Sequence, residues 1–390
     1  MSRRRVAVTG IGVVAPCGIG ADAFWDGLLA EPPPGERRIT DFDPSPWFGT
    51  KDARRTDRFA QFAVAAAAMA LDDAGPLDID PARRGVMLGS GVGGLETLEK
   101  QIVIRHEKGP DRVSPFLVPM MMANAGAASV SMRFGWQGPC ETTVTACAAG
   151  THAIANAARL VVHGICDAAL GGGSEAALTP TSIAGFTNMT ALSSTGISRP
   201  FDVERDGFVI AEGGAVVVLE ELEAARARGA RIYGEILGSG SSADAHHITA
   251  PNPTGSGAIR CMEQALADAG LAPEDIRQIN GHGTSTPLND AAEAEAITKV
   301  FGTPGPPVTS TKGVTGHALG AAGALEAVAV LLSIDRRLIP PTAGLDNLDP
   351  EITIDVVTEP QPWEPGPTLS NSFGFGGHNG CLLMAPVDDA

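Results

Sequence analysis

Short segments of β-branched and apolar residues alternate with longer alanine-rich segments along most of the chain. The short segments predict buried strands, at residues 6–9, 85–90, 142–145, 167–173, 208–220, 232–241, 276–280, 307–310, 352–357, 368–372 and 381–385. The alanine-rich segments predict helices, at residues 23–29, 58–74, 124–133, 148–160, 221–228, 255–270, 290–301 and 320–335. This alternation predicts an α/β fold with mostly parallel sheets covered by helices on both faces. Segments 208–220 and 232–241 are expected to be antiparallel strands around the intervening helix.

Length and composition indicate a large globular protein. At 390 residues the chain exceeds one ordinary domain, so we expect two domain-sized halves. Hydrophobic residues make up 44% of the chain and charged residues 19%. The longest apolar runs, at 62–71 and 327–332, are well below the ~20 residues that cross a bilayer. We therefore expect no membrane span.

The net charge limits which partners the protein can bind, and the cysteine content indicates its cellular compartment. The net charge is −17, which argues against binding to nucleic acid or to an anionic membrane. The six cysteines include no C-x-x-C pair, and no signal peptide is recognisable at the start of the chain. They indicate reduced thiols in the cytoplasm.

Cys147 lies where a strand pattern meets a helix pattern. A thiol at this joint faces the free N–H groups and the positive end of the helix dipole, and both favour the thiolate. The small neighbours Ala146, Ala148 and Gly150 leave room for a substrate at the sulfur. On these residues alone, a buried structural cysteine is an equally good interpretation.

Two loops rich in glycine and threonine each present a histidine. The loop Asn280-Gly-His-Gly-Thr-Ser-Thr286 contains His282, and the loop Ser310-Thr-Lys-Gly-Val-Thr-Gly-His317 ends at His317. The second loop runs into the predicted helix at 320–335. A lone histidine in such a turn is more often structural.

With these motifs in this order, the chain resembles the β-ketoacyl-acyl carrier protein synthases, and among them the elongating Cys-His-His branch. The resemblance begins at Val6-Ala-Val-Thr-Gly-Ile-Gly12 and ends at Asn371-Ser-Phe-Gly-Phe-Gly-Gly377. It implies the thiolase fold, in which two pseudo-symmetric halves stack in α-β-α-β-α layers. We place these halves at residues 1–240, with the nucleophile, and 241–390, with both histidines.

The resemblance also implies a reaction, the decarboxylative condensation of an acyl group with malonyl-acyl carrier protein in fatty acid biosynthesis. Cys147 matches the residue that carries the acyl group. The backbone N–H groups of Cys147 and Phe375 match the donors of the oxyanion hole. His282 and His317 match the two histidines that stabilise the enolate through Nε2.

Further residues match supporting positions of the family. Lys312 and Glu326 match an ion pair that orients the histidines. Thr284 and Thr286 match residues that bind the pantetheine arm, although turn hydroxyls that bond to their own backbone are an equally good interpretation. Leu98 matches a position whose side chain limits acyl chain length.

Docking of the acyl carrier protein is expected on a basic segment. The carrier proteins of this family are acidic, as this chain is, so a local basic patch must offset their repulsion. The candidate residues are three to four apart, which would place them on one helical face. They are Lys51, Arg54, Arg55 and Arg58.

Several alternatives stay open at this stage. The chain could instead be the ketosynthase of a type II polyketide or polyene pathway, and would then form a heterodimer with a chain-length factor rather than a homodimer. Cys147 argues against the chain-length factor itself, which lacks the nucleophile. A cysteine hydrolase needs only one histidine, so the second histidine argues against that class. We expect no cofactor and no metal. His378 stands where the family usually has threonine, and its role is open.

Overall fold

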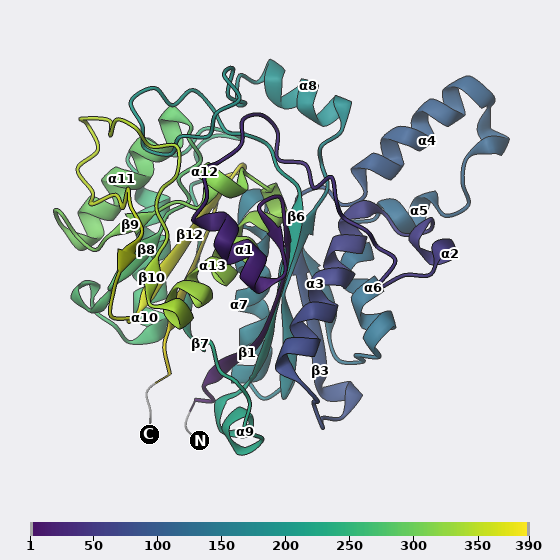
Figure 1. The fold of residues 1–390 in the computed structure, drawn as a ribbon, viewed down its shortest axis with the longest axis horizontal. Coiled ribbons are helices and arrows are strands. Elements are labelled where there is room, and N and C mark those ends of the chain that lie inside the picture. Colours follow the sequence, from purple (N-terminus) through teal and green to yellow (C-terminus); the bar gives the residue numbers. More distant parts are fainter. Residues whose placement is uncertain (1–2, 388–390) are drawn as a thin grey trace.

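The computed structural model describes residues 3–387 and is built around one mixed sheet (Figure 1). The first half of the sheet has the strand order β1, β6, β5, β3, β4. The first two neighbouring pairs in this order are antiparallel and the last two are parallel. The strands are β1 (Val6–Ala15), β3 (Arg84–Gly89), β4 (Cys140–Thr143), β5 (Ala168–Glu175) and β6 (Gly213–Glu221).

The second half of the sheet repeats this arrangement in the order β7, β13, β12, β8, β9. Again two antiparallel pairs are followed by two parallel pairs. The strands are β7 (Gly234–Ala243), β8 (Gln278–Asn280), β9 (Val308–Thr309), β12 (Thr368–Gly374) and β13 (His378–Ala385). The prediction of two pseudo-symmetric halves is confirmed, and residue 240 lies inside β7.

Three details of the predicted strands are wrong. The sheet is mixed rather than mostly parallel, because the strands nearest its centre run antiparallel. Strands β6 and β7 run in the same direction rather than antiparallel, because β1 lies between them and is antiparallel to both. Residues 352–357 form no strand, and among them only Val356 makes a bridge, to Val308. A local pattern cannot reveal a neighbour that comes from the other end of the chain.

Six helices complete five layers, with two on each outer face and two between the halves of the sheet (Figure 1). The outer helices are α3 (Arg58–Ala74) and α6 (Ala125–Phe134) on one face, and α10 (Ser256–Ala269) and α11 (Pro287–Phe301) on the other. The middle helices are α7 (Ala149–Val162) and α13 (Ala322–Arg336).

Alternating side chains on the strands bind these layers together. On β6, Val217 faces the middle layer and Val218 faces α3 and α6. On β13, Met384 faces the middle layer and Leu383 faces α10 and α11. Successive residues of a strand point to opposite faces, so each strand joins two hydrophobic clusters.

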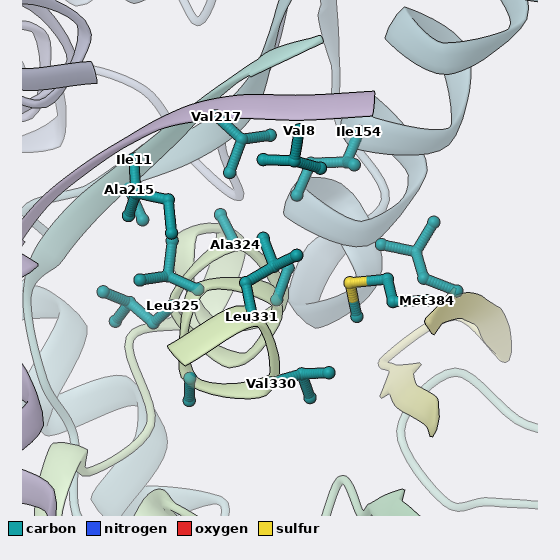
Figure 2. Close-up of a cluster of buried hydrophobic side chains, with 14 of the residues drawn as sticks. Val8, Ile11, Ile154, Ala215, Val217, Ala324, Leu325, Val330, Leu331 and Met384 are labelled. Carbon is teal, nitrogen blue, oxygen red and sulfur yellow. The ribbon is translucent and has the colours of Figure 1, made fainter. Parts of the chain in front are cut away.

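The middle layer holds the main hydrophobic core (Figure 2). Every residue of α13 from 322 to 334 is buried. Figure 2 shows Leu325, Val330 and Leu331 of this helix with Val8 of β1 and Met384 of β13. A helix that is buried on all sides and apolar at nearly every position is typical of such an internal layer.

Glycine and alanine allow the helices to lie very close to the strands. A Cβ atom at Gly12 of β1 would lie 1.9 Å from the carbonyl oxygen of Ala66 in α3. Only glycine fits at that position, because no side chain can approach backbone so closely. Close approach of this kind explains how a core with few aromatic residues is filled.

Helices α4 and α5 project away from the layered body, with α2 close by (Figure 1). No helix in residues 3–387 is long and apolar enough to cross a membrane. The remaining elements are β2 (Gly18–Ile19), β10 (Leu338–Ile339), β11 (Gln361–Pro362), α1 (Ala21–Leu28), α2 (Thr50–Ala53), α4 (Leu95–Lys108), α5 (Leu117–Met121), α8 (Pro180–Asn188), α9 (Leu222–Ala227) and α12 (Lys312–Thr315).

Candidate active site

Cys147 lies at the N-terminus of α7, where the sequence predicts it. The chain leaves β4 and passes through a short 3₁₀ turn, Ala146–Ala148, into the helix. Ala146 has a φ of 49°, a left-handed conformation that costs a residue other than glycine about 1–3 kcal/mol. Leu319, at the matching place before α13, has a φ of 46°. The strained turn puts Cys147 at the wall of a cavity.

The two predicted histidines meet at the sulfur of Cys147. The Nε2 atom of His317 lies 3.0 Å from this sulfur. The rings of His282 and His317 are 5.3 Å apart between centroids and almost perpendicular, at 85°. All three side chains are buried. Cys147 and His317 meet because the first turns of α7 and α13 pack together, with only 2.8 Å between a Cβ placed on Gly150 and the nitrogen of Ala324.

Lys312 and Glu326 support His282. The ammonium of Lys312 pairs with the Glu326 carboxylate, lies 3.2 Å from His282 Nδ1 and donates to the His282 carbonyl at 2.5 Å. An ammonium group only donates, so Nδ1 accepts and the proton of neutral His282 is on Nε2. Burial, and then the charges of Lys312 and His317, hold the pKa of His282 well below its usual value, against the opposite effect of the Phe373 carbonyl. His282 is therefore a neutral donor through Nε2.

His317 carries its proton on the same atom. Its Nδ1 is buried and has no hydrogen-bond partner within residues 3–387. Because buried N–H groups without a partner are rarer than buried acceptors without one, the proton is assigned to Nε2. Burial, and then the charge of Lys312, hold the pKa of His317 well below its usual value. Two neutral imidazoles thus present N–H groups beside the Cys147 sulfur.

Burial dominates the pKa of Cys147 and raises it to about 11. The positive charge of Lys312 and the N–H of Phe375 lower this pKa, but by less than burial raises it. The expectation that the helix N-terminus favours the thiolate is therefore wrong in its net direction. The reason is that loss of solvent penalises the charged form of a fully buried group.

Two buried carboxylates hold the loop of His282, and the sequence analysis missed both. Glu293 accepts from the backbone N–H groups of His282 and Gly283, each at 2.7 Å, and Asp290 accepts from that of Thr284 at 2.9 Å. Burial raises the pKa of Glu293 to about 7. The sequence signal that could have identified these two residues is the presence of acidic residues in the first turns of the helix that follows the loop.

The glycine hairpin between β12 and β13 packs on the 3₁₀ turn that contains Cys147. The backbone N–H of Phe375 lies close enough to the Cys147 sulfur to lower the pKa of the thiol. A Cβ atom at Gly374 would lie 2.9 Å from the Thr145 oxygen and 3.1 Å from the Cys147 nitrogen, so a side chain there would push the hairpin away. The two N–H groups that the sequence predicts as oxyanion donors therefore lie beside the Cys147 sulfur.

A cavity of about 560 Å³ opens over these groups. Thr284 and Thr286 line it, with their hydroxyl oxygens 2.9 Å apart. The Thr286 hydroxyl also accepts from the N–H of Asn289 at the start of α11, so it is partly a helix cap. Apolar side chains, including Phe186 and Leu319, form another part of the wall. A cavity with polar groups and an apolar wall suits a long ligand with a polar arm and an apolar end.

The cysteine and the two histidines could also hold a metal ion by residue type. Their ligand atoms lie within 4.8 Å of one another, and thiolate and imidazole are ligands of zinc. The ammonium of Lys312 beside His282 opposes a second cation there.

Two family models cover most of the chain. Residues 35–225 match the β-ketoacyl synthase N-terminal domain, and residues 233–346 match the β-ketoacyl synthase C-terminal domain. The chain belongs to the β-ketoacyl synthase family. The two matches change over just before β7, a few residues ahead of the boundary expected near residue 240.

Individual relatives agree with this assignment. A 3-oxoacyl-[acyl-carrier-protein] synthase 2 from Synechocystis sp. is 45% identical over an alignment of 417 positions that covers 98% of each chain. The solved ishigamide ketosynthase/chain length factor has a TM-score of 0.95 at 34% identity and covers 99% of this chain and 100% of its own. A type II polyketide acyl-carrier protein complex with its hexaketide-bound ketosynthase has a TM-score of 0.90, at the same identity and coverage. This β-ketoacyl synthase is thus an acyltransferase.

The predicted docking residues of this synthase do not share one helical face. Lys51 lies in the four-residue helix α2, and Arg54 and Arg55 lie in the turn that follows. Arg58 is the first residue of α3, and its guanidinium donates to the buried Glu212 at 2.8 Å and 3.0 Å. The prediction of one face is wrong, because Asp57 ends the turn and starts a new helix. Lys51, Arg54 and Arg55 are exposed, whereas Arg58 is engaged inside the fold.

Leu98 and His378 lie outside the cavity wall as the described residues define it. Leu98 is half-buried in α4, whereas Val92, just before that helix, lines the cavity. His378 is the first residue of β13 and pairs with Gly374 across the hairpin. It is thus close to the hairpin of Phe375 without forming part of the wall.

Proposed function

We propose that this β-ketoacyl synthase joins an acyl group held on Cys147 to malonyl on an acyl carrier protein, with loss of carbon dioxide, in fatty acid elongation. The observation that carries the proposal is the 3.0 Å approach of His317 Nε2 to the Cys147 sulfur, with His282 alongside. Relatives named 3-oxoacyl-[acyl-carrier-protein] synthase 2 support the elongation role.

In the first step, the Cys147 sulfur attacks the thioester carbonyl of the acyl carrier. A new carbon–sulfur bond forms, the bond to the pantetheine sulfur breaks, and the thiol proton moves to the departing sulfur. The N–H groups of Cys147 and Phe375 stabilise the oxyanion of the tetrahedral intermediate. The hydroxyl groups of Thr284 and Thr286 bind the pantetheine arm in the cavity.

In the second step, the malonyl thioester loses carbon dioxide. The bond between the carboxylate and the α-carbon breaks, and its electron pair forms an enolate. His282 and His317 donate from Nε2 to the enolate oxygen. Neutral donors suffice here, because hydrogen bonds to a developing charge are strong in a buried site of low dielectric.

In the third step, the α-carbon attacks the acyl carbonyl on Cys147. The same two backbone N–H groups stabilise the new oxyanion. Its collapse releases the 3-oxoacyl product and the thiolate of Cys147, which takes up a proton. The condensation thus needs only groups of this chain and the two carrier-bound substrates, and we propose no cofactor and no metal.

The carrier protein is assigned to the surface of Lys51, Arg54 and Arg55. These exposed cations offer a local attraction on a chain whose net charge is −17. Attraction at short range can outweigh repulsion at long range, because salt screens distant charges. One relative is solved with a type II polyketide acyl-carrier protein, which supports carrier binding in this family.

A second copy of the chain is assigned to the free edge of the sheet. Strand β4 ends the sheet, and the apolar side chains of Met132 and Val144 beside it are 78% and 50% exposed. An exposed edge next to an apolar surface favours strand pairing with another chain. We propose a homodimer, with a chain-length factor as the alternative occupant, as in the solved ishigamide pair.

A type II polyketide ketosynthase is the second candidate function. It is favoured by the type II polyketide ketosynthase and by the ishigamide ketosynthase/chain length factor, which both match over 99% of this chain. In that case this chain is the catalytic subunit, since it contains Cys147. We place either reaction in the cytoplasm, because all six cysteines are free thiols.

Two variants, each given two assays, test the proposal. Cys147→Gln removes the nucleophile and supplies an amide oxygen for the oxyanion donors, so it should decarboxylate malonyl-acyl carrier protein without making product. His317→Ala should still form the acyl adduct but decarboxylate about 10²–10³-fold more slowly. Intact mass with a panel of acyl carrier proteins detects the adduct, and carbon dioxide release reports the second step. Normal decarboxylation by His317→Ala, or product from Cys147→Gln, would show that the roles are wrong.

A further inference from the structure

His152 joins the nucleophile turn to the oxyanion hairpin. It lies on α7, five residues after Cys147, and is buried. Its Nδ1 is 2.8 Å from the hydroxyl oxygen of Thr145, in the turn before Cys147. Its Nε2 is 3.1 Å from the carbonyl oxygen of Asn379 and 3.1 Å from the hydroxyl oxygen of Ser241. One imidazole therefore links three elements of the site with both of its nitrogens.

These partners determine which nitrogen carries the proton. The Asn379 carbonyl can only accept, so Nε2 is protonated, and Nδ1 accepts from the Thr145 hydroxyl. Burial lowers the pKa of His152, and the charges of His378 and Arg159 act in the same direction, against the Asn379 carbonyl. The neutral ring is thus a donor to the hairpin and an acceptor from the turn.

The link matters because the two oxyanion donors come from different elements. The N–H of Cys147 belongs to the 3₁₀ turn before α7, and that of Phe375 belongs to the hairpin between β12 and β13. Two donors stabilise one oxyanion only if their separation suits it, since each must lie about 3 Å from the same oxygen. Something must therefore hold the turn and the hairpin at a constant spacing.

We propose that His152 is a positioning residue that sets the spacing between the N–H groups of Cys147 and Phe375 by tying Thr145 to Asn379. It does not belong to the cavity wall formed by the described residues, so it acts through its partners and not on the substrate. This inference rests on the proposed function, because it requires acyl transfer to Cys147.

Packing around the imidazole leaves it little freedom to move. A Cβ atom at Gly380 of β13 would lie 3.0 Å from His152 Nε2 and 3.1 Å from its Cδ2. The ring therefore lies directly against the backbone of the strand that carries Asn379. A shift of the hairpin would have to move the ring, and through it the Thr145 turn.

Two reactions of Cys147, acyl transfer and alkylation, can be compared in each variant. The comparison distinguishes a change in the spacing of the oxyanion donors from a change in the reactivity of the sulfur. Transfer from an acyl-pantetheine thioester passes through an oxyanion, whereas alkylation by iodoacetamide does not. His152→Leu removes both hydrogen bonds, so it should slow acyl transfer by about 10–10²-fold, less than complete loss of a donor would. Alkylation should change far less. His163→Leu, at the exposed C-terminal end of the same helix, is the matched control and should behave like the wild type.

Two further variants keep the test valid if His152→Leu folds poorly. Thr145→Val removes the hydroxyl at similar volume and should also slow acyl transfer selectively. Combined with His152→Leu it should add little, because both changes break the same link. His152→Gln retains an amide donor for Asn379 and should recover part of the rate.

The results distinguish failure of the positioning role of His152 from failure of the proposed function. Equal losses of acyl transfer and alkylation, or independent effects of the Thr145 and His152 changes, would overturn the positioning role alone. If wild-type protein forms no acyl adduct at Cys147 with any thioester in the panel, the proposed function fails instead.

Discussion

Replacing Lys312 with methionine should separate the charge of this side chain from its length. Lys312 and Glu326 are 1% and 2% exposed and form an ion pair. The substitution leaves the Glu326 carboxylate buried without its cation. Breaking a buried pair in this way costs about 3–5 kcal/mol of the free energy of unfolding, because one charge remains uncompensated. Lys312→Met should therefore be clearly destabilised.

A double variant separates this loss of stability from the chemistry. In Lys312→Met/Glu326→Gln neither side chain is charged, so most of the stability should return. Activity should not return, because nothing then holds the proton of His282 on Nε2. If Nδ1 takes the proton, the site loses one donor to the enolate, with an upper limit of about 10²–10³-fold in decarboxylation.

The pH dependence of decarboxylation gives an independent test of the charge of Lys312. Lys312 lowers the pKa of both His282 and His317. These histidines are neutral at any pH above their lowered pKa values and become protonated below them. Without the ammonium both pKa values rise, so the acid limb of decarboxylation should move toward neutral pH in the double variant.

The assay is carbon dioxide release from malonyl-acyl carrier protein across pH, with denaturant unfolding of each variant in parallel. Wild-type decarboxylation by the double variant would refute the orienting role of Lys312. An unchanged acid limb would show that its charge does not control the histidines. A stable Lys312→Met variant would contradict the buried ion pair.

Two other predictions concern the carrier and the acyl chain. Arg54→Glu/Arg55→Glu should raise KM for acyl carrier protein but not for a small acyl-pantetheine, because only the carrier reaches these exposed residues; equal losses on both substrates would argue against docking there. Val92 lines the cavity and Leu98 does not, so Val92→Phe should shorten the preferred acyl chain and Leu98→Phe should leave it unchanged. A two-carbon change is worth about 1.6 kcal/mol, or about 15-fold in kcat/KM, and a chain-length panel giving the opposite ranking would contradict the assignment.

Much of the fold and the centre of the site could be predicted from local patterns. Alternating strands and alanine-rich helices indicate layers, because each element must bury its apolar face on another. The change from β-branched to small residues around Cys147 marks a strand that runs into a helix. His282 and His317 are recognisable because glycine-rich turns present them and the order of motifs matches one family.

The supporting residues were harder to predict, because they are ordinary residues in ordinary helices. Glu293 and His152 look like a helix-surface acid and a helix histidine. Their importance comes from partners that are far away in the sequence, such as His282 for the first and Asn379 for the second. Spacing along one helix contains no information about such partners.

By itself, the sequence determined most of the elements, because the periodicity that defines them is local. Through its resemblance to one family it also indicated the two similar halves and the roles of Cys147, His282 and His317. Only the tertiary structure decided how those side chains behave. It raised the pKa of Cys147 where the sequence predicts a lowered one, because burial outweighs the charge of Lys312 and the nearby backbone N–H groups. It also engages Arg58, one of the four predicted docking residues, because Glu212, from a distant segment, binds its guanidinium. Burial and charge pairing depend on what the rest of the chain brings to each residue.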